Sequence, residues 1–134
     1  MHRVRKTLLI VDDEELVCRG IARGFRHAFE HICFATHPDE AERILADEEV
    51  TDLICDYNLG ESLPAGTDLM ERWRRAFPQI QRAVLYSGAD LSQIALSCWI
   101  DFKISKSCPI ADLYHAVLLD AQEHEIELQA AVAQ

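Results

Sequence analysis

Basic residues are scarce in this chain relative to acidic ones. Its 134 residues include 13 Lys and Arg against 23 Asp and Glu, which gives a formal net charge of −10 at pH 7. A protein that binds nucleic acid or an anionic membrane concentrates Lys and Arg on the surface that meets the phosphates. The acidic balance therefore argues against both kinds of partner, and we expect no nucleic acid and no membrane among the partners of this protein.

Long apolar runs and paired cysteines are also missing. No apolar stretch approaches the roughly 18 residues that a membrane-spanning helix needs, and the run 8–11 after the basic N-terminus is too short for a signal peptide. The five cysteines include no Cys-x-x-Cys pair, which favours reduced thiols over a disulfide framework or a zinc site. Both absences predict a cytoplasmic protein.

The chain has no internal repeat or linker, and its hydrophobic content of 49% is typical of one folded domain. Short apolar runs alternate with amphipathic stretches. The apolar runs predict strands at 6–11, 31–35, 52–55, 82–87 and 102–105, and the helical spacing predicts helices at 14–29, 38–48, 67–77, 92–99 and from 109 onward. This alternation predicts an α/β protein, a single doubly wound (βα)5 fold with a parallel five-stranded sheet and helices on both faces.

Side chains that can carry chemistry follow the predicted strands where each strand ends. Asp12 and Asp13 follow the first strand, Asp56 follows the third, Ser87 ends the fourth and Lys106 follows the fifth. In an open parallel sheet, the carboxyl ends of the strands meet at one edge, where the functional site lies. We therefore expect three carboxylates, a hydroxyl and an amine to meet there.

Three carboxylates held close together need a counter-charge. At about 5 Å each pair repels by about 3 kcal/mol when the effective dielectric is near 20, and a divalent cation relieves this repulsion. Mg²⁺ prefers oxygen ligands and keeps several waters, and a carboxylate beside it can act as the nucleophile in phosphoryl transfer. Because Asp56 stands alone and Asp12 and Asp13 come as a pair, we assign Asp56 as the nucleophile and the pair as metal ligands.

Four segments at these strand ends resemble the receiver domain of two-component response regulators. They are LIVDDE at 9–14, DLICDYNL at 52–59, VLYSG at 84–88 and ISK at 104–106. The resemblance covers about residues 6–121, and it implies the flavodoxin-like, CheY-like receiver architecture. We therefore expect a receiver domain at 1–121, followed by a C-terminal helical extension at 122–134 that is too short to be an effector domain.

The resemblance implies a Mg²⁺ site, in which Mn²⁺ could replace the magnesium. Asp13 matches the direct metal ligand, and Asp12 matches its partner, which often acts through water. Asp56 matches the phosphoacceptor, which also contacts the metal, and Asn58 matches the position that lends its backbone carbonyl. Ser87 matches the hydroxyl that hydrogen-bonds the phosphoryl group.

Lys106 matches the lysine that pairs with the phosphoryl group in this family. The implied reaction is transfer of a phosphoryl group from the phosphohistidine of a sensor histidine kinase or histidine phosphotransfer protein onto Asp56, followed by slow hydrolysis. The implied protein is a signalling domain in a two-component or phosphorelay system, not a classical turnover enzyme. We expect it to signal by contact with a downstream protein, as a monomer or weak dimer.

Some positions depart from the family pattern. Gly60 stands where proline is frequent, with Pro64 and Gly66 following later, and Lys103 stands where an aromatic switch residue is usual. Phe102 is one residue away, on the opposite face of a strand unless a β-bulge intervenes. The short span between Ser87 and Lys106 also predicts a clipped fourth helix. We therefore expect a retained phosphorylation pocket and an unusual output face.

Other interpretations stay open at this point. The chain could be a receiver module cut from a larger hybrid kinase or regulator, or a binding module that ignores phosphate. The acidic pair at 12–13 could also be no more than a helix N-terminus, where acids are favourable. An aspartate-nucleophile phosphatase on a related fold fits less well, because those enzymes place two aspartates two residues apart after one strand.

Overall fold

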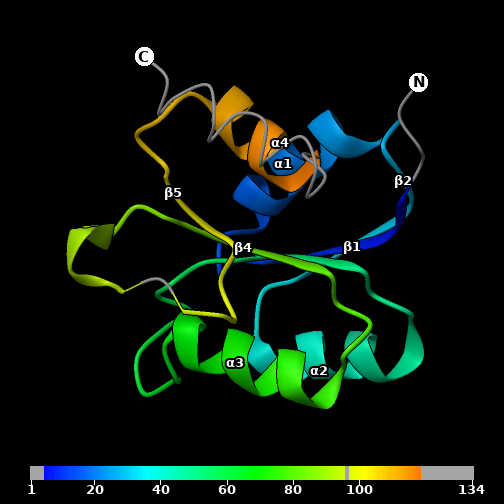
Figure 1. Ribbon diagram of the computed structural model, residues 1–134, viewed down its shortest axis with the longest axis horizontal. Coiled ribbons are helices and arrows are strands. Elements are labelled where there is room, and N and C mark those ends of the chain that lie inside the picture. Colours follow the sequence, from blue (N-terminus) through cyan, green and yellow to red (C-terminus); the bar gives the residue numbers. More distant parts are fainter. Residues whose placement is uncertain (1–4, 96, 119–134) are drawn as a thin grey trace.

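The computed structural model describes residues 5–95 and 97–118 and has three layers, with a sheet between two layers of helices (Figure 1). Its elements are β1 (Arg5–Val11), α1 (Glu15–Phe25), β2 (Phe29–Ala35), α2 (Pro38–Asp47), β3 (Asp52–Cys55), α3 (Gly66–Ala76), β4 (Arg82–Ser87), the 3₁₀ turn η1 (Leu91–Gln93), β5 (Phe102–Ser105) and α4 (Ile110–Leu118). The predicted extension at 122–134 lies outside the described residues. None of the helices within them is long and apolar enough to cross a membrane.

The sheet has five parallel strands in the order β2-β1-β3-β4-β5. This confirms the predicted doubly wound fold. Strand β1 lies between β2 and β3, and the connections that follow β1 and β3 lead to helices on opposite faces of the sheet (Figure 1). The carboxyl ends of β1 and β3 therefore form the switch point of the sheet, where ligands bind in folds of this kind.

Each face of the sheet carries its own apolar cluster. The helices α2 and α3 cover one face, where Trp73 is 1% exposed, and α1 and α4 cover the other, where Phe25 is fully buried (Figure 1). The strand β1 contributes to both clusters because its residues 7–11 are all buried. A continuous apolar run is what a strand covered on both faces requires.

Two helix boundaries differ from the sequence prediction. The helix expected to reach residue 29 ends at Phe25, and β2 begins at Phe29. The Arg5 N–H donates to the Ala28 carbonyl at 2.9 Å, which draws this segment onto the sheet edge and ends the helix early. The helix expected from residue 67 begins one residue earlier, at Gly66, and its N-cap Ala65 makes no side-chain cap.

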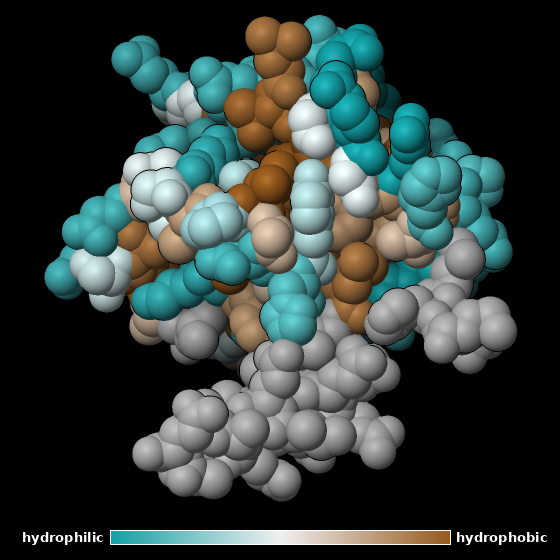
Figure 2. All heavy atoms as spheres, turned by 90° about the horizontal axis from the view of Figure 1, so that it is seen from above, coloured by the Kyte–Doolittle hydropathy of each residue, from teal (hydrophilic) through white to brown (hydrophobic). Residues whose placement is uncertain are grey.

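Among the residues that the structure describes, the face formed by α1 and α4 leaves two large apolar side chains exposed. Leu16 is 84% exposed and Ile110 is 42% exposed. Figure 2 looks onto this face and shows apolar side chains reaching the surface among hydrophilic ones. Ile110 is exposed because it begins α4, before the helix reaches the sheet with Leu113 and Val117.

The connection between β4 and β5 differs most from the sequence prediction. The helix expected at 92–99 is reduced to η1, a single turn capped by Asp90, whose carboxylate accepts the Ser92 N–H at 3.0 Å. The fourth helix of the (βα)5 pattern is therefore a 3₁₀ turn, and the expectation of a clipped helix is confirmed. The backbone is already extended again at Ile94.

The register of β4 and β5 is regular, so no β-bulge restores the aromatic position. Val84 pairs with Phe102 and Leu85 pairs with Lys103. Phe102 packs in the cluster beneath α1 and α4, whereas Leu85, the neighbour of Lys103, belongs to the cluster beneath α2 and α3. Lys103 therefore takes the position of the aromatic residue on the α3 side of the sheet.

Candidate functional site

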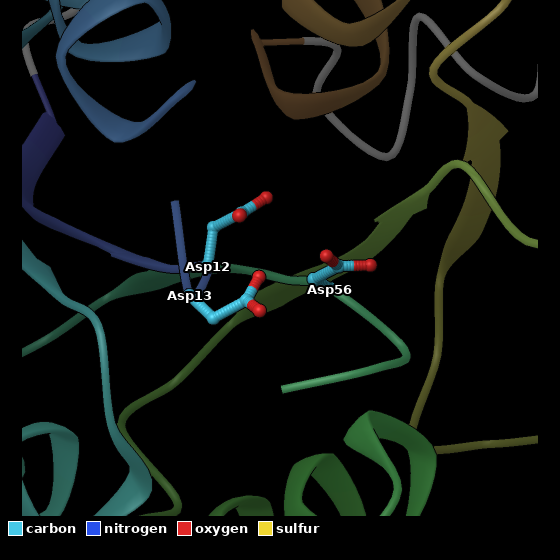
Figure 3. Close-up of side chains that lie close together, drawn as sticks. All are labelled: Asp12, Asp13 and Asp56. Atoms are coloured by element: carbon cyan, nitrogen blue, oxygen red, sulfur yellow. The ribbon is translucent and has the colours of Figure 1, made fainter. Parts of the chain in front are cut away.

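The acidic residues are fixed by backbone hydrogen bonds that continue the sheet past the strand ends. The Asp12 N–H donates to the Ala35 carbonyl at 3.1 Å, and the Asp56 N–H donates to the Val11 carbonyl at 2.9 Å. Asp12 and Asp56 thus stand next to each other at the switch point. Figure 3 shows the side chains of Asp12, Asp13 and Asp56 together at the ends of β1 and β3.

These three aspartates form the one cluster of three or more metal-ligating side chains among the residues described. Each offers a carboxylate oxygen, and these oxygens all lie within 4.8 Å of one another. Asp12 and Asp56 are buried, whereas Asp13 is exposed. The cluster is therefore closed by the sheet on one side and reachable from solvent on the other.

The amine of Lys106, the residue that follows β5, joins the cluster. Its Nζ donates to Oδ2 of Asp12 at 2.7 Å and to Oδ2 of Asp56 at 3.1 Å. Its backbone N–H donates to the Ser87 carbonyl at 2.9 Å, which fixes the end of β5 against β4. The ring centroid of Tyr86 lies 5.9 Å from the same Nζ.

Burial and charge act in opposite directions in this cluster. Burial disfavours the charge of Lys106, but the hydrogen bond and charge of Asp12, together with Asp56, outweigh it and raise the pKa of Lys106. Burial raises the pKa of Asp12, although the Lys106 amine and the Glu14 N–H favour its carboxylate; the charge of Asp56 raises it further. One amine thus leaves negative charge in the cluster uncompensated, which a bound cation relieves.

The remaining predicted site residues lie around the cluster. Ser87 is buried at the end of β4, and its hydroxyl accepts the Ala89 N–H at 3.3 Å. The Tyr57 N–H donates to Oδ1 of Asp56 at 2.7 Å and so orients that carboxylate. Asn58, two residues past Asp56, lies in the turn after β3 with its side chain exposed.

Gly66 has a role that the sequence analysis missed. A Cβ at this position would lie 1.9 Å from the Asp56 carbonyl oxygen. The Gly66 N–H also donates to the Tyr57 carbonyl at 2.8 Å. The start of α3 therefore closes directly on the turn that carries Asp56. A glycine at the junction of a loop and a helix is the one feature of the sequence that could have indicated a close contact, but only the folded loop shows that the contact is with Asp56.

Two buried thiols lie beside the acidic cluster and add no charge to it. The Cys18 thiol donates to the Asp12 carbonyl at 3.5 Å, and the Cys55 thiol donates to the Asp56 carbonyl at 3.3 Å. Burial raises the pKa of Cys18 to about 12 and raises that of Cys55 as well. Both stay protonated at neutral pH, and a protonated thiol is a poor nucleophile.

No protein-family model matches the sequence, and the search of curated proteins gave no match either. Solved structures do match. The signal receiver domain of an HD domain-containing protein from Pseudomonas fluorescens Pf-5 is 26% identical, with a TM-score of 0.75 over 92% of this chain and 98% of that one. A response regulator from Burkholderia pseudomallei, with a phosphorylated aspartic acid, a calcium ion and citrate, is 21% identical, with a TM-score of 0.74 over 96% of this chain and 75% of that one.

A third match is a response regulator from Thermotoga maritima in complex with Mg²⁺ and BeF. It is 20% identical, with a TM-score of 0.69 over 82% of this chain and 94% of that one. Some other matching chains are longer, and this chain covers 57% to 64% of them. The structural neighbours of this chain are response regulator receiver domains, and its fold is their CheY-like α/β fold.

Proposed function

We propose that this chain is a phosphoacceptor receiver domain that takes a phosphoryl group onto Asp56. The observation that carries the proposal is the Lys106 amine, which bonds Asp12 and Asp56 at once beside the open carboxylate of Asp13. With Asp56 as the proposed nucleophile and the aspartates as proposed metal ligands, the Lys106 amine supports the proposal because it lies at the same edge of the sheet. Phosphoryl transfer depends on such positioning and charge neutralisation.

The acidic cluster fits Mg²⁺. Its donors are all oxygens, and the exposed Asp13 leaves room for the waters that Mg²⁺ keeps. Asp13 and Asp56 would hold the ion with the Asn58 carbonyl, and Asp12 would contact it through water; Mn²⁺ suits the same ligands. When bound, the ion neutralises negative charge on the phosphoryl oxygens. Support comes from the Thermotoga neighbour, which was solved with Mg²⁺ and BeF.

In the proposed reaction, a carboxylate oxygen of Asp56 attacks the phosphorus of a phosphohistidine. The new bond joins phosphorus to oxygen, and the phosphorus–nitrogen bond breaks with its electron pair returning to the imidazole. The Lys106 amine, already 3.1 Å from Asp56 Oδ2, pairs with a phosphoryl oxygen, and the Ser87 hydroxyl donates to another. Water later hydrolyses the acyl phosphate. The Burkholderia neighbour, which carries a phosphorylated aspartic acid, supports this chemistry.

The partners we propose are a sensor histidine kinase or histidine phosphotransfer protein as donor and a downstream protein as receiver of the signal. The formal net charge of −10 supports a protein partner over nucleic acid. We propose a cytoplasmic signalling domain that hydrolyses its own phosphate and turns over no separate substrate. Whether it acts alone or within a larger hybrid kinase or regulator does not alter this chemistry.

The test is intact-mass measurement after incubation with Mg²⁺ and acetyl phosphate, a small acyl phosphate. We expect a gain of one phosphoryl group, and we expect Asp56→Asn to abolish it because an amide is not a nucleophile toward phosphorus. The matched control is Asp39→Asn, which changes an exposed carboxylate outside the cluster. Labelling of the Asp56→Asn protein would show that the nucleophile is assigned wrongly. No labelling of the wild type would favour a binding module that ignores phosphate.

A further inference from the structure

The connection between β4 and β5 is held by an amine from the strand that follows it. Lys103 Nζ donates to the Leu91 carbonyl at 2.9 Å and to the Ile94 carbonyl at 2.7 Å. The Leu91 carbonyl also accepts the Ile94 N–H at 3.1 Å, the bond that closes η1. A charged donor therefore satisfies both ends of the turn that replaces the fourth helix.

The other end of the same connection is tied to α3 by two arginines. Arg74 donates to the Trp99 carbonyl at 3.2 Å and to Oδ2 of Asp101 at 3.0 Å. The Arg75 guanidinium lies 5.0 Å from the centre of the Trp99 ring. Residues 97–101 are thus held independently of Lys103, so loss of the lysine contacts would free η1 without releasing the whole connection.

The part that Lys103 holds is directly coupled to Ser87. The Ser87 hydroxyl accepts the Ala89 N–H at 3.3 Å, and the lysine holds the chain again at Leu91. If the Ser87 hydroxyl turns toward a phosphoryl oxygen, the hydrogen bond from the Ala89 N–H to this hydroxyl changes. Residues 88–90 then rearrange between the end of β4 and Leu91, which the lysine holds in place. The leucine side chain is itself buried in the cluster beneath α2 and α3. A firm hold at Leu91 therefore opposes movement that starts at Ser87.

We propose that Lys103 is a restraint on the β4–β5 connection, which holds η1 in one arrangement and limits how far phosphorylation at Asp56 can move residues 88–95. The second half rests on the proposed function. The first half rests only on the lysine contacts. Lys103 is a positioning residue in this scheme and touches no reacting atom.

Hydrogen exchange of the peptide 88–95 in the unphosphorylated protein tests the restraint. We expect Lys103→Met to speed exchange at the Ile94 amide at least tenfold, because methionine keeps an apolar stem and lacks the donor. Lys103→Arg keeps a charged donor and should recover most of the protection. The matched control is Lys6→Met, which removes an exposed lysine that pairs with Glu49.

Two results of this first experiment would overturn the restraint. One is exchange in Lys103→Met within twofold of the wild type or of the Lys6→Met control. The other is an arginine variant as unprotected as the methionine variant, which would assign the effect to packing and not to the amine. Neither outcome depends on phosphorylation, so this experiment tests the restraint independently of the proposed function.

The second arm adds Mg²⁺ and beryllofluoride, which stands in for the phosphoryl group, and follows the same peptide. Bound beryllofluoride is detected separately by its ¹⁹F resonance. We expect the analogue to change exchange of 88–95 at least threefold more in Lys103→Met than in the wild type. Equal changes would overturn the coupling. If the analogue binds neither the wild type nor Lys103→Met, the proposed function fails and the coupling that rests on it fails with it, whereas the result of the first arm is unaffected.

Discussion

At the scale of single residues, we expect replacement by alanine to have opposite effects on stability at two helical glycines. A Cβ at Gly66 would lie 1.9 Å from the Asp56 carbonyl oxygen, whereas a Cβ at Gly20 in α1 would meet nothing within 4 Å. We expect Gly66→Ala to destabilise the fold by about 1–3 kcal/mol, as overpacking against a fixed backbone does. We expect Gly20→Ala to stabilise it by about 0.5–1 kcal/mol, because alanine is the better helix former.

Urea unfolding of both glycine variants measures these free energies, and acetyl phosphate labelling reports on the site. The Gly66→Ala protein should also label more slowly, because the clash is with the backbone that carries Asp56. A Gly66→Ala protein as stable and as fast to label as the wild type would show that α3 does not close on the Asp56 turn.

The contrast between Asp56 and Gly66 shows what sequence can predict at this scale. Asp12, Asp56 and Lys106 follow apolar runs, and the geometry of a parallel sheet sends the ends of such runs to one edge. Their convergence was therefore predictable, and the structure brings them together. The contact of Gly66 with Asp56 depends on the path of the loop 58–65, which no periodicity encodes.

At the scale of elements, α4 is held to the sheet by an arginine from β4. Arg82 donates to the Ala116 carbonyl at 2.7 Å, and its guanidinium lies 5.7 Å from the centre of the Phe102 ring. Burial lowers the pKa of Arg82, although Asp101 and Asp52 favour its charge. A guanidinium that donates to a carbonyl oxygen forms a charge-assisted hydrogen bond, which is stronger than one between neutral groups.

We expect Arg82→Met to lower the free energy of unfolding by about 1.5–3 kcal/mol, the usual range for a hydrogen bond to a charged group. The control is Arg23→Met in the last turn of α1, which removes an exposed arginine. The measurement is the free energy of unfolding of both variants in urea, and we expect a larger loss for Arg82→Met. Equal losses in both would show that the change in net charge, and not the Ala116 contact, sets the stability.

The elements themselves were predictable to different degrees. Strand β1 and helix α2 have strong patterns, a continuous apolar run and a proline in the first turn, and both lie where expected. The segment 92–99 has an apolar residue at Ile94 and a helical spacing, but the structure forms only the turn η1 at its start, where Lys103 binds the Ile94 carbonyl, and Arg74 binds the Trp99 carbonyl at its end. Contacts between residues far apart in sequence override local preference in such segments.

At the scale of the whole molecule, the protein carries an excess of negative charge, and the fold brings part of that charge together at the switch point of the sheet. The formal net charge is −10, and three carboxylates share the switch point with a single amine. Like charges held close together by the sheet oppose folding, and a ligand that binds only the folded state stabilises it by mass action. A cation at this point therefore acts on the stability of the entire domain.

We expect Mg²⁺ to raise the thermal midpoint, with a gain of about 1.4 kcal/mol in stability when the free ion is ten times its Kd. The measurement is thermal unfolding with MgCl₂ against NaCl at equal ionic strength, which separates binding from screening. Asp13→Asn should remove most of the Mg²⁺ effect and, by deleting a charge from the cluster, raise the midpoint in the absence of the ion. Asp39→Asn, an exposed change elsewhere, should keep the wild-type response. An undiminished Mg²⁺ shift in Asp13→Asn would mean that the ion binds outside the cluster, because the variant lacks the exposed carboxylate of the cluster.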